Sequence, residues 1–257
     1  MNEVEKYSAE LLSSAQTHLN RCLVKSSGKE LHALRVQIKK IHALLHLLAY
    51  CYQLPYQENK ALKKLFKRAG KIRNLQLTMF RLEKQVKPKR KCSKNLLAEL
   101  KGELDSRINR FEKHYKHHKD KAFKKTAELV HECVRMKIKK ETALYFRMMK
   151  EKINRAVRQR NRNQKQTHQL RKDIKTLKYN LALSVNTDSK FLTEEKLLNK
   201  MEKLLGEWHD AVQMASRLKK LKSKLKSKAQ SDLQRIGLSY ADRSKFLLKK
   251  FRQLQPV

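Results

Sequence analysis

Basic residues recur at one spacing in two separate parts of the chain. One segment reads LHALRVQIKKIHALL from Leu31, and the other reads THQLRKDIKTLKYNL from Thr167. Both contain the pattern HxxRxxxK, whose members are His32, Arg35 and Lys39 in the first segment and His168, Arg171 and Lys175 in the second. Arginine offers phosphate a planar two-pronged donor, lysine a point charge and histidine a further donor. These residue types together favour the binding of phosphate groups.

Helical geometry would gather these residues on one side of each segment. At about 100° per residue, each set falls within about 80° of the helix wheel. We call these sets the first basic stripe (His32, Arg35, Lys39 and His42) and the second basic stripe (His168, Arg171, Lys175 and Lys178). The apolar residues lie at neighbouring angles, so each stripe is predicted to border the core. Cations stacked in this way repel one another unless an anion lies among them, which predicts a groove or channel for a linear polyanion.

The two stripes belong to an internal repeat. The offset of 136 residues that carries His32 onto His168 also carries Gly70 onto Gly206 without a gap. KRAGKIRNLQ around Gly70 thus aligns with KLLGEWHDAV around Gly206. Any two amphipathic helices share leucines, but that similarity does not explain the matched His, Arg and Lys. We infer a duplication with a seam near residue 136, and one domain over residues 1–257 made of halves 1–136 and 137–257.

Composition restricts the elements that can position the stripes. Only five of the 257 residues are Gly and three are Pro, too few for the turns of sandwiches, barrels or nucleotide-binding sheets. Apolar residues recur with helical spacing, which predicts helices over 3–24, 29–53, 58–69, 71–86, 93–118, 120–134, 139–160, 164–185, 192–205, 207–228 and 240–254. Breaks are expected at 26–28, Pro55, 87–89, 186–188 and Gly237. Ser93 and Thr193 are the predicted N-caps.

The charge balance indicates the class of partner. Lys and Arg number 63 against 24 Asp and Glu, a formal net charge of +39. Such a chain is expected to bind an anionic polymer or an anionic membrane surface. No segment approaches the ~20 apolar residues of a membrane span, and the N-terminus has no apolar signal region. Cys22, Cys51, Cys92 and Cys133 form no CxxC pair, so we expect reduced thiols and a cytoplasmic location.

Both repeated helices resemble the signature helix of the CHAD family, the conserved histidine α-helical domain. The family helix reads HxxRVxxRRLR in the first half, which His32, Arg35, Val36, Lys39 and Lys40 match. It reads HxLRKxxKxLRY in the second half, which His168, Leu170, Arg171, Lys172, Lys175, Lys178 and Tyr179 match. A later (A/L)G-x-x-(R/N)D segment is similar to Ala69, Gly70, Arg73 and Asn74 and to Leu205, Gly206 and Asp210. Lys39, Lys40 and Lys178 replace commoner arginines, Asn74 replaces the usual Asp, and His209 stands where Asn or Arg is common.

The resemblance covers residues 3–254 and implies a fold and a function. It implies an all-α protein of two pseudo-symmetric four-helix bundles with a basic channel between them. It also implies non-enzymatic binding of inorganic polyphosphate, association with polyphosphate granules, and no cofactor or metal. Some members carry a fused triphosphate-hydrolysing CYTH domain, for which this chain has no room. The implied binding residues are His32, Arg35, Lys39, Lys40, His42, Arg73, His168, Arg171, Lys172, Lys175 and Lys178.

A basic run before the second stripe is expected to line the channel entrance. The run RQRNRNQK supplies Arg158, Arg160 and Arg162. Alone, such a run is usually a solvated face, but with a net charge of +39 it would extend an electrostatic funnel toward the channel. Arg158 and Arg162 are therefore added to the predicted polyphosphate site.

Two other functions stay open. A sequence-nonspecific nucleic-acid binder would also depend on phosphate contacts, but aromatic residues are only 7% and no recognised nucleic-acid motif occurs. An HD-type phosphohydrolase is suggested by His209-Asp210, although the first copy has Arg73-Asn74 there, which cannot hold a metal pair. A metal site at His114, His117 and His118 is disfavoured, because adjacent histidines are by themselves weak evidence for one. The sequence leaves the oligomeric state open.

Overall fold

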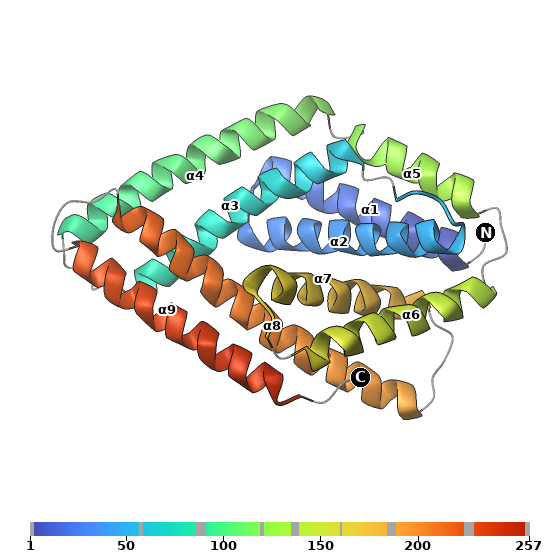
Figure 1. Ribbon diagram of the computed structural model, residues 1–257. Helices are drawn as coiled ribbons and strands as arrows, with labels where there is room; N and C mark the ends of the chain where they lie inside the picture. Colours follow the sequence, from blue (N-terminus) through green and yellow to red (C-terminus); the bar gives the residue numbers. More distant parts are fainter. Residues whose placement is uncertain are drawn as a thin grey trace. The chain divides into compact units, whose positions relative to one another are not determined.

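The computed structural model describes residues 3–56, 59–85, 91–118, 121–134, 139–159, 161–183, 189–223 and 229–254, and most of these residues are helical (Figure 1). In chain order the helices are α1 (Glu3–Val24), α2 (Gly28–Cys51), α3 (Lys60–Gln85), α4 (Lys91–His118), α5 (Lys121–Val134), α6 (Lys139–Arg158), α7 (Gln164–Asn180), the 3₁₀ helix η1 (Leu181–Leu183), α8 (Ser189–Lys222) and α9 (Ala229–Arg252). No strand occurs in these ranges, so the predicted all-α class is confirmed. Nor does any helix there combine the length and apolar character of a membrane span.

The chain divides into two compact units. Unit 1 comprises Met1–Leu82, Leu96–Tyr145 and Tyr179–Ser184, and unit 2 comprises Glu83–Asn95, Phe146–Lys178 and Val185–Val257. The first basic stripe therefore belongs to unit 1 and the second to unit 2. The predicted halves 1–136 and 137–257, and the two pseudo-symmetric bundles, stay predictions.

Unit 1 is built around an antiparallel pair, α1 and α2 (Figure 1). The turn between them ends at Ser27, whose Oγ accepts a hydrogen bond from the Glu30 amide at 3.2 Å, so the expected break at 26–28 is confirmed. Apolar residues at helical spacing from α1 to α5 form one core: Leu11, Ala15, Leu19, Leu31, Leu34, Ile38, Ile41, Leu62, Leu65, Ala69, Ile72, Phe111, Phe123 and Val130. The buried side of α2 fixes the direction in which its basic stripe faces.

Unit 2 is built around the antiparallel pair α8 and α9, which lie side by side (Figure 1). Its buried residues follow the same helical spacing: Met149, Ile153, Leu170, Ile174, Leu177, Leu198, Met201, Leu205, Trp208, Met214, Leu218, Leu233, Ile236 and Phe251. Leu170, Ile174 and Leu177 anchor α7, so the second stripe borders the core of its unit in the same way as the first.

Glycine does not end helices in this chain, contrary to the predicted boundaries. Gly70 lies within α3, Gly206 within α8 and Gly237 within α9, so 58–69 joins 71–86, 192–205 joins 207–228, and the last helix begins at Ala229 instead of residue 240. A helical glycine costs about 1 kcal/mol relative to alanine, whereas each buried leucine or isoleucine beside it contributes about 1.5–3 kcal/mol. Burial on both sides of Gly70 and Gly206 therefore keeps α3 and α8 continuous, whereas Gly237 has its buried neighbours, Leu233 and Ile236, on one side.

Two predicted N-caps are also wrong, because α4 begins at Lys91 and α8 at Ser189, which places Ser93 and Thr193 inside helices. The break near Pro55 is confirmed, since α2 ends at Cys51 and Gln53 adopts a left-handed φ of 52°. The breaks expected at 87–89 and 186–188 lie outside the described residues.

Two of the four cysteines can be described, and both are thiols outside any disulfide bond. Cys22 is buried in the core of unit 1, and Cys51 is half-buried. Burial, followed by the nearby carboxylates of Glu30 and Glu112, raises the pKa of Cys22 to about 12. The Cys22 thiol therefore stays protonated and packs as a small apolar side chain. The side chains of Cys92 and Cys133 lie outside the described residues.

Candidate functional site

The first basic stripe runs along α2 beside the core of unit 1. Leu34 and Ile38 on this helix are fully buried. His32 is exposed, whereas Arg35 and Lys39 are half-buried. Lys40 and His42 are half-buried as well. The stripe thus borders the core, and its cations are partly shielded from the water that would otherwise weaken their mutual repulsion.

Arg35 is held in place by α3. Its Nη1 donates a hydrogen bond to the carbonyl oxygen of Phe66 at 2.6 Å, and its guanidinium carbon lies 3.9 Å from the centre of the Phe66 ring. Gly70 lies one turn further along α3, and a Cβ there would come within 2.2 Å of Arg35 Nη1. Gly70 therefore provides the space that the guanidinium fills. Burial lowers the pKa of Arg35 to about 10, which still leaves it charged at neutral pH.

The Phe66 ring is the centre around which the stripe is arranged. Lys39 Nζ lies 5.9 Å from the ring centroid, and the His42 ring lies 6.4 Å from it. His42 Nδ1 is hydrogen-bonded to the Tyr56 hydroxyl at 3.1 Å, and His46 stacks on the Tyr56 ring at 4.0 Å. Phe66 attracts the cations through its π face without adding negative charge. Sequence reasoning did not include Phe66 or Tyr56.

Arg73 lies against the first turn of the helix that carries the stripe. A Cβ at Gly28, the first residue of α2, would come within 2.5 Å of Arg73 Nη1. Gln76, one turn further along α3, donates from Nε2 to the Ser26 carbonyl oxygen at 3.0 Å. The structure thus brings Arg73 to within about one helical turn of His32.

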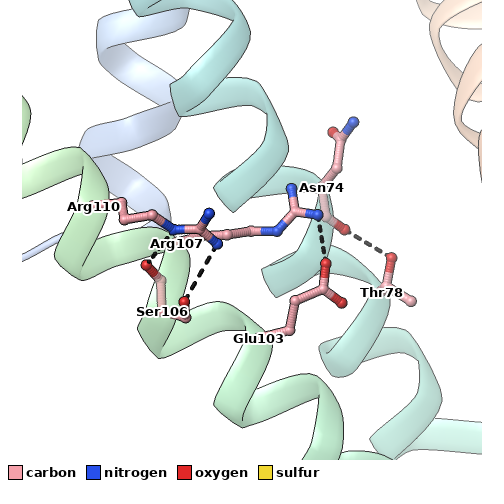
Figure 2. A network of polar contacts seen from close by, with 6 residues as sticks. All are labelled: Asn74, Thr78, Glu103, Ser106, Arg107 and Arg110. Atoms are coloured by element: carbon pink, nitrogen blue, oxygen red, sulfur yellow. Dashed lines mark hydrogen bonds and ion pairs between the residues drawn. The ribbon is translucent and has the colours of Figure 1, made fainter.

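Asn74, next to Arg73, belongs to a group of polar contacts on α3 and α4, each of which lies within one helix (Figure 2). Thr78 Oγ1 donates to the Asn74 carbonyl oxygen at 2.7 Å. Figure 2 shows Arg107 extending from α4 toward α3, and its guanidinium pairs with Glu103, one turn earlier on α4, at 2.5 Å. The drawn network uses only the main chain of Asn74. The change from the family's usual Asp therefore leaves these contacts intact.

The start of α7 is fixed by reciprocal capping. Asn163 Oδ1 accepts from the Gln166 amide at 2.9 Å, and Gln166 Oε1 accepts from the Asn163 amide at 2.8 Å. Thr167, the next residue, is fully buried and donates from Oγ1 to the Asn163 carbonyl oxygen at 2.9 Å. This capping box sets the register in which α7 presents the second stripe.

His168 begins the second stripe and stacks on His209 of α8, with ring centroids 4.6 Å apart. Burial lowers the pKa of His168, and the positive charges of Lys172 and Arg171 lower it further. The ring is therefore neutral at neutral pH. Arg171 is half-buried and Lys172 is exposed, and both lie about one turn after His168 on α7.

A carboxylate from α8 neutralises part of the second stripe. Lys175 Nζ and Lys178 Nζ each lie 2.5 Å from one of the two carboxylate oxygens of Glu202. The side chains are only 15%, 30% and 19% exposed, respectively. Burial alone would raise the pKa of Glu202, but the hydrogen bonds and charges of the two lysines outweigh it, so this pKa lies below its usual range. Glu202 was missed in the sequence, although the repeat offset of 136 pairs it with Phe66.

The two arginines predicted at the channel entrance have different surroundings. Arg158 is the exposed last residue of α6. Arg162 is only 7% exposed, and its Nη1 donates to the carbonyl oxygens of Val157 at 3.0 Å, Gln159 at 2.6 Å and Ala156. These bonds close the C-terminus of α6, where carbonyl groups lack helical partners. The structure therefore gives Arg162 a structural role. Arg160 lies outside the described residues.

The comparisons with known proteins give a family match over most of the chain. The family model described as the CHAD domain matches residues 6–219. The chain belongs to the CHAD family. The family predicted from the two signature helices is thereby confirmed.

A solved structure resembles this CHAD chain over nearly its whole length. The crystal structure of the CHAD domain from the plant Ricinus communis matches with a TM-score of 0.76 and covers 97% of this chain and 90% of its own. The two sequences are 14% identical, so the likeness shows a shared CHAD fold. A search of curated proteins found no match.

Proposed function

We propose that the chain binds inorganic polyphosphate through its two basic stripes and does not hydrolyse it. The main observation behind this proposal concerns Arg35 and Lys39. Both are half-buried cations beside the core, and the α3 side chain that they surround, Phe66, is uncharged. A phosphate chain along α2 would relieve their repulsion at the point where water relieves it least. CHAD domains are known to bind polyphosphate, which supports the same conclusion.

The dimensions of the stripe suit a chain and not a single phosphate group. From His32 to His42 the stripe extends for about 15 Å at 1.5 Å per residue. A linear polyanion can contact each cation in turn, whereas a small anion reaches only part of the stripe. The net charge of +39 would draw such a polymer to the protein from a distance.

The proposed contacts come from both units. In unit 1 they are His32, Arg35, Lys39, Lys40, His42 and Arg73; in unit 2 they are Arg158, His168, Arg171, Lys172, Lys175 and Lys178. We leave out Arg162, because its guanidinium is committed to the end of α6. Binding of one polymer by both stripes remains part of the proposal. A protein of this kind would accompany polyphosphate granules in the cytoplasm.

Binding without catalysis is supported by the surroundings of His209. Its ring is stacked on His168, and the neighbouring Asp210 is exposed. Across the part of the chain that the structure describes, no group of three His, Cys, Asp or Glu side chains is placed to hold a metal ion. A phosphohydrolase of the HD type would need such a group.

Affinity for polyphosphate is expected to fall steeply as the salt concentration rises and as the polyphosphate chain becomes shorter. Each phosphate that is neutralised releases a counterion, and tripolyphosphate is too short to cover a whole stripe. Calorimetric titrations with long-chain polyphosphate and with tripolyphosphate over a salt series would measure both effects. Sulfate at matched ionic strength is the control, and incubation with Mg²⁺ or Mn²⁺ should release no phosphate. Equal affinity for the long and the short chain would contradict binding along a stripe.

A further inference from the structure

A group of basic side chains that belongs to neither stripe joins α3 and α4 in unit 1. It consists of Lys64 and Arg68 on α3 and His114 and His118 on α4, and we call it the α3–α4 basic cluster. The cluster is organised around Tyr115, which is only 3% exposed. The His114 ring meets the Tyr115 ring at 88° with centroids 4.8 Å apart, and the guanidinium carbon of Arg68 lies 5.7 Å from the centre of the same ring. A buried aromatic ring thus brings a histidine of α4 and an arginine of α3 together.

The two histidines of the cluster are stacked on each other. Their ring centroids are 4.9 Å apart and their planes differ by 8°. His118 Nδ1 donates a hydrogen bond to the His114 carbonyl oxygen at 2.9 Å, so the neutral His118 ring carries its proton on Nδ1 and can accept another at Nε2. Protonation of both rings would place two positive charges face to face at neighbouring turns of one helix, which is unfavourable unless an anion joins them.

The charged groups that act on His114 are all basic. Burial lowers the pKa of His114, and the positive charges of Arg68, His118 and Lys64 lower it further. Glu112, two residues before His114, is directed elsewhere, because its carboxylate accepts a hydrogen bond at 3.1 Å from a side chain of the turn that precedes α2. The cluster therefore gathers positive charge around a histidine ring that is neutral at neutral pH.

We infer that the α3–α4 basic cluster is a binding site for a doubly charged tetrahedral anion such as a phosphate group, and that His114 takes up a proton from solvent when the anion binds. Arg68 would supply a two-pronged donor and Lys64 a point charge. The protonated rings of His114 and His118 would add further N–H donors, and the anion would offset their mutual repulsion. The inference does not depend on the proposed function, since none of these residues belongs to a stripe.

Uptake of a proton makes binding dependent on pH. Because the anion stabilises the charged ring, the pKa of His114 is higher in the complex than in the free protein. Affinity for the anion is therefore greatest at acidic pH and falls as the pH rises through the pKa of the complex.

Nuclear magnetic resonance of the histidine rings tests the inference in the full chain. The pH titration of His114 would be followed in sodium chloride and in sodium sulfate at matched ionic strength, with His114→Gln used to assign its signals among the ten histidines. Sulfate is the probe because it is tetrahedral and keeps its charge over the range in which histidine titrates. We expect sulfate to raise the titration midpoint of His114 more than that of His117, an exposed histidine of the same helix.

Arg68→Gln tests whether the cluster itself holds the anion, because it removes one positive charge from an exposed position of α3. The sulfate concentration that half-saturates the change in the His114 signals should rise at least about fivefold, as expected for the loss of a charge-assisted hydrogen bond. The matched control is Lys67→Gln, which removes the same charge from the adjacent exposed position. The control should stay within about twofold, since only a general field effect remains.

The outcomes separate a built site from general screening. A sulfate effect that is larger at His114 than at His117, weakened in Arg68→Gln and retained in Lys67→Gln, supports the site. Equal effects at the two histidines of the unaltered protein would overturn it without recourse to any variant, and so would equal losses in Arg68→Gln and Lys67→Gln. None of these results bears on the stripes, whose function is measured with long-chain polyphosphate.

Discussion

Replacing Lys39 and Lys175 together by glutamate is expected to weaken binding of long-chain polyphosphate far more than the loss of charge alone would. Each lysine is half-buried beside the core of its unit and belongs to a row of cations on one helix. A glutamate in that row would repel the phosphate chain at a place where solvent screening is weak. We expect a loss at least about tenfold greater than in a charge-matched control, or about 1.4 kcal/mol, in calorimetric titration.

The control for this double variant is Lys101→Glu with Lys220→Glu. Lys101 on α4 and Lys220 on α8 are exposed, and one lies in each unit. The two double variants therefore remove the same charge from the same parts of the protein. Circular dichroism must first show that both are folded, because Lys39 and Lys175 border buried residues. Equal losses of affinity in the two proteins would mean that polyphosphate responds only to net charge.

Arg162→Ala is expected to lower the free energy of unfolding by about 2–4 kcal/mol, because it leaves three carbonyl oxygens at the end of α6 without the buried guanidinium that now donates to them. The Arg162 guanidinium serves three carbonyl groups at the end of α6 and also lies 5.6 Å from the centre of the Phe251 ring. Urea denaturation monitored by circular dichroism would measure the change.

Arg158→Ala is the matched control for Arg162→Ala. Arg158 comes from the same basic run but is exposed, so its removal should change stability by less than about 0.5 kcal/mol. Equal stability in the two variants would show that Arg162 does not close α6. The pair thus separates an arginine that holds the fold from one that is free to face a polyanion.

The local part of the structure could be predicted from the sequence. Helical spacing alone gave the helix over 29–53, found as Gly28–Cys51, and correctly identified Leu34, Ile38 and Ile41 as buried. Because the direction of each side chain on a helix follows from its position, the same reasoning placed Arg35 and Lys39 beside the core. Glycines misled this local reasoning, since burial around Gly70 and Gly206 outweighs their low helix propensity.

Contacts between helices could not be predicted in this way. Nothing in the periodicity of α7 indicates that Glu202 of α8 reaches Lys175. Likewise, nothing in the periodicity of α2 indicates that Arg35 donates to the Phe66 carbonyl group of α3. These contacts depend on how helices pack, which residue spacing within one helix does not specify. The repeat offers one indirect signal, because its offset makes Phe66 and Glu202 equivalent positions. The contacts that each of them makes are seen only in the structure.

Competition between long-chain polyphosphate and duplex DNA tests the central claim most directly. Labelled polyphosphate bound to the unaltered protein would be challenged at moderate salt with DNA of equal total phosphate concentration. A flexible phosphate chain can follow the half-buried cations of α2, whereas a duplex presents its phosphates on a broad, stiff surface. Our account predicts that unlabelled polyphosphate displaces the label and that DNA does so only in large excess. Displacement by DNA at equal phosphate concentration would contradict it and indicate a nonspecific nucleic-acid binder.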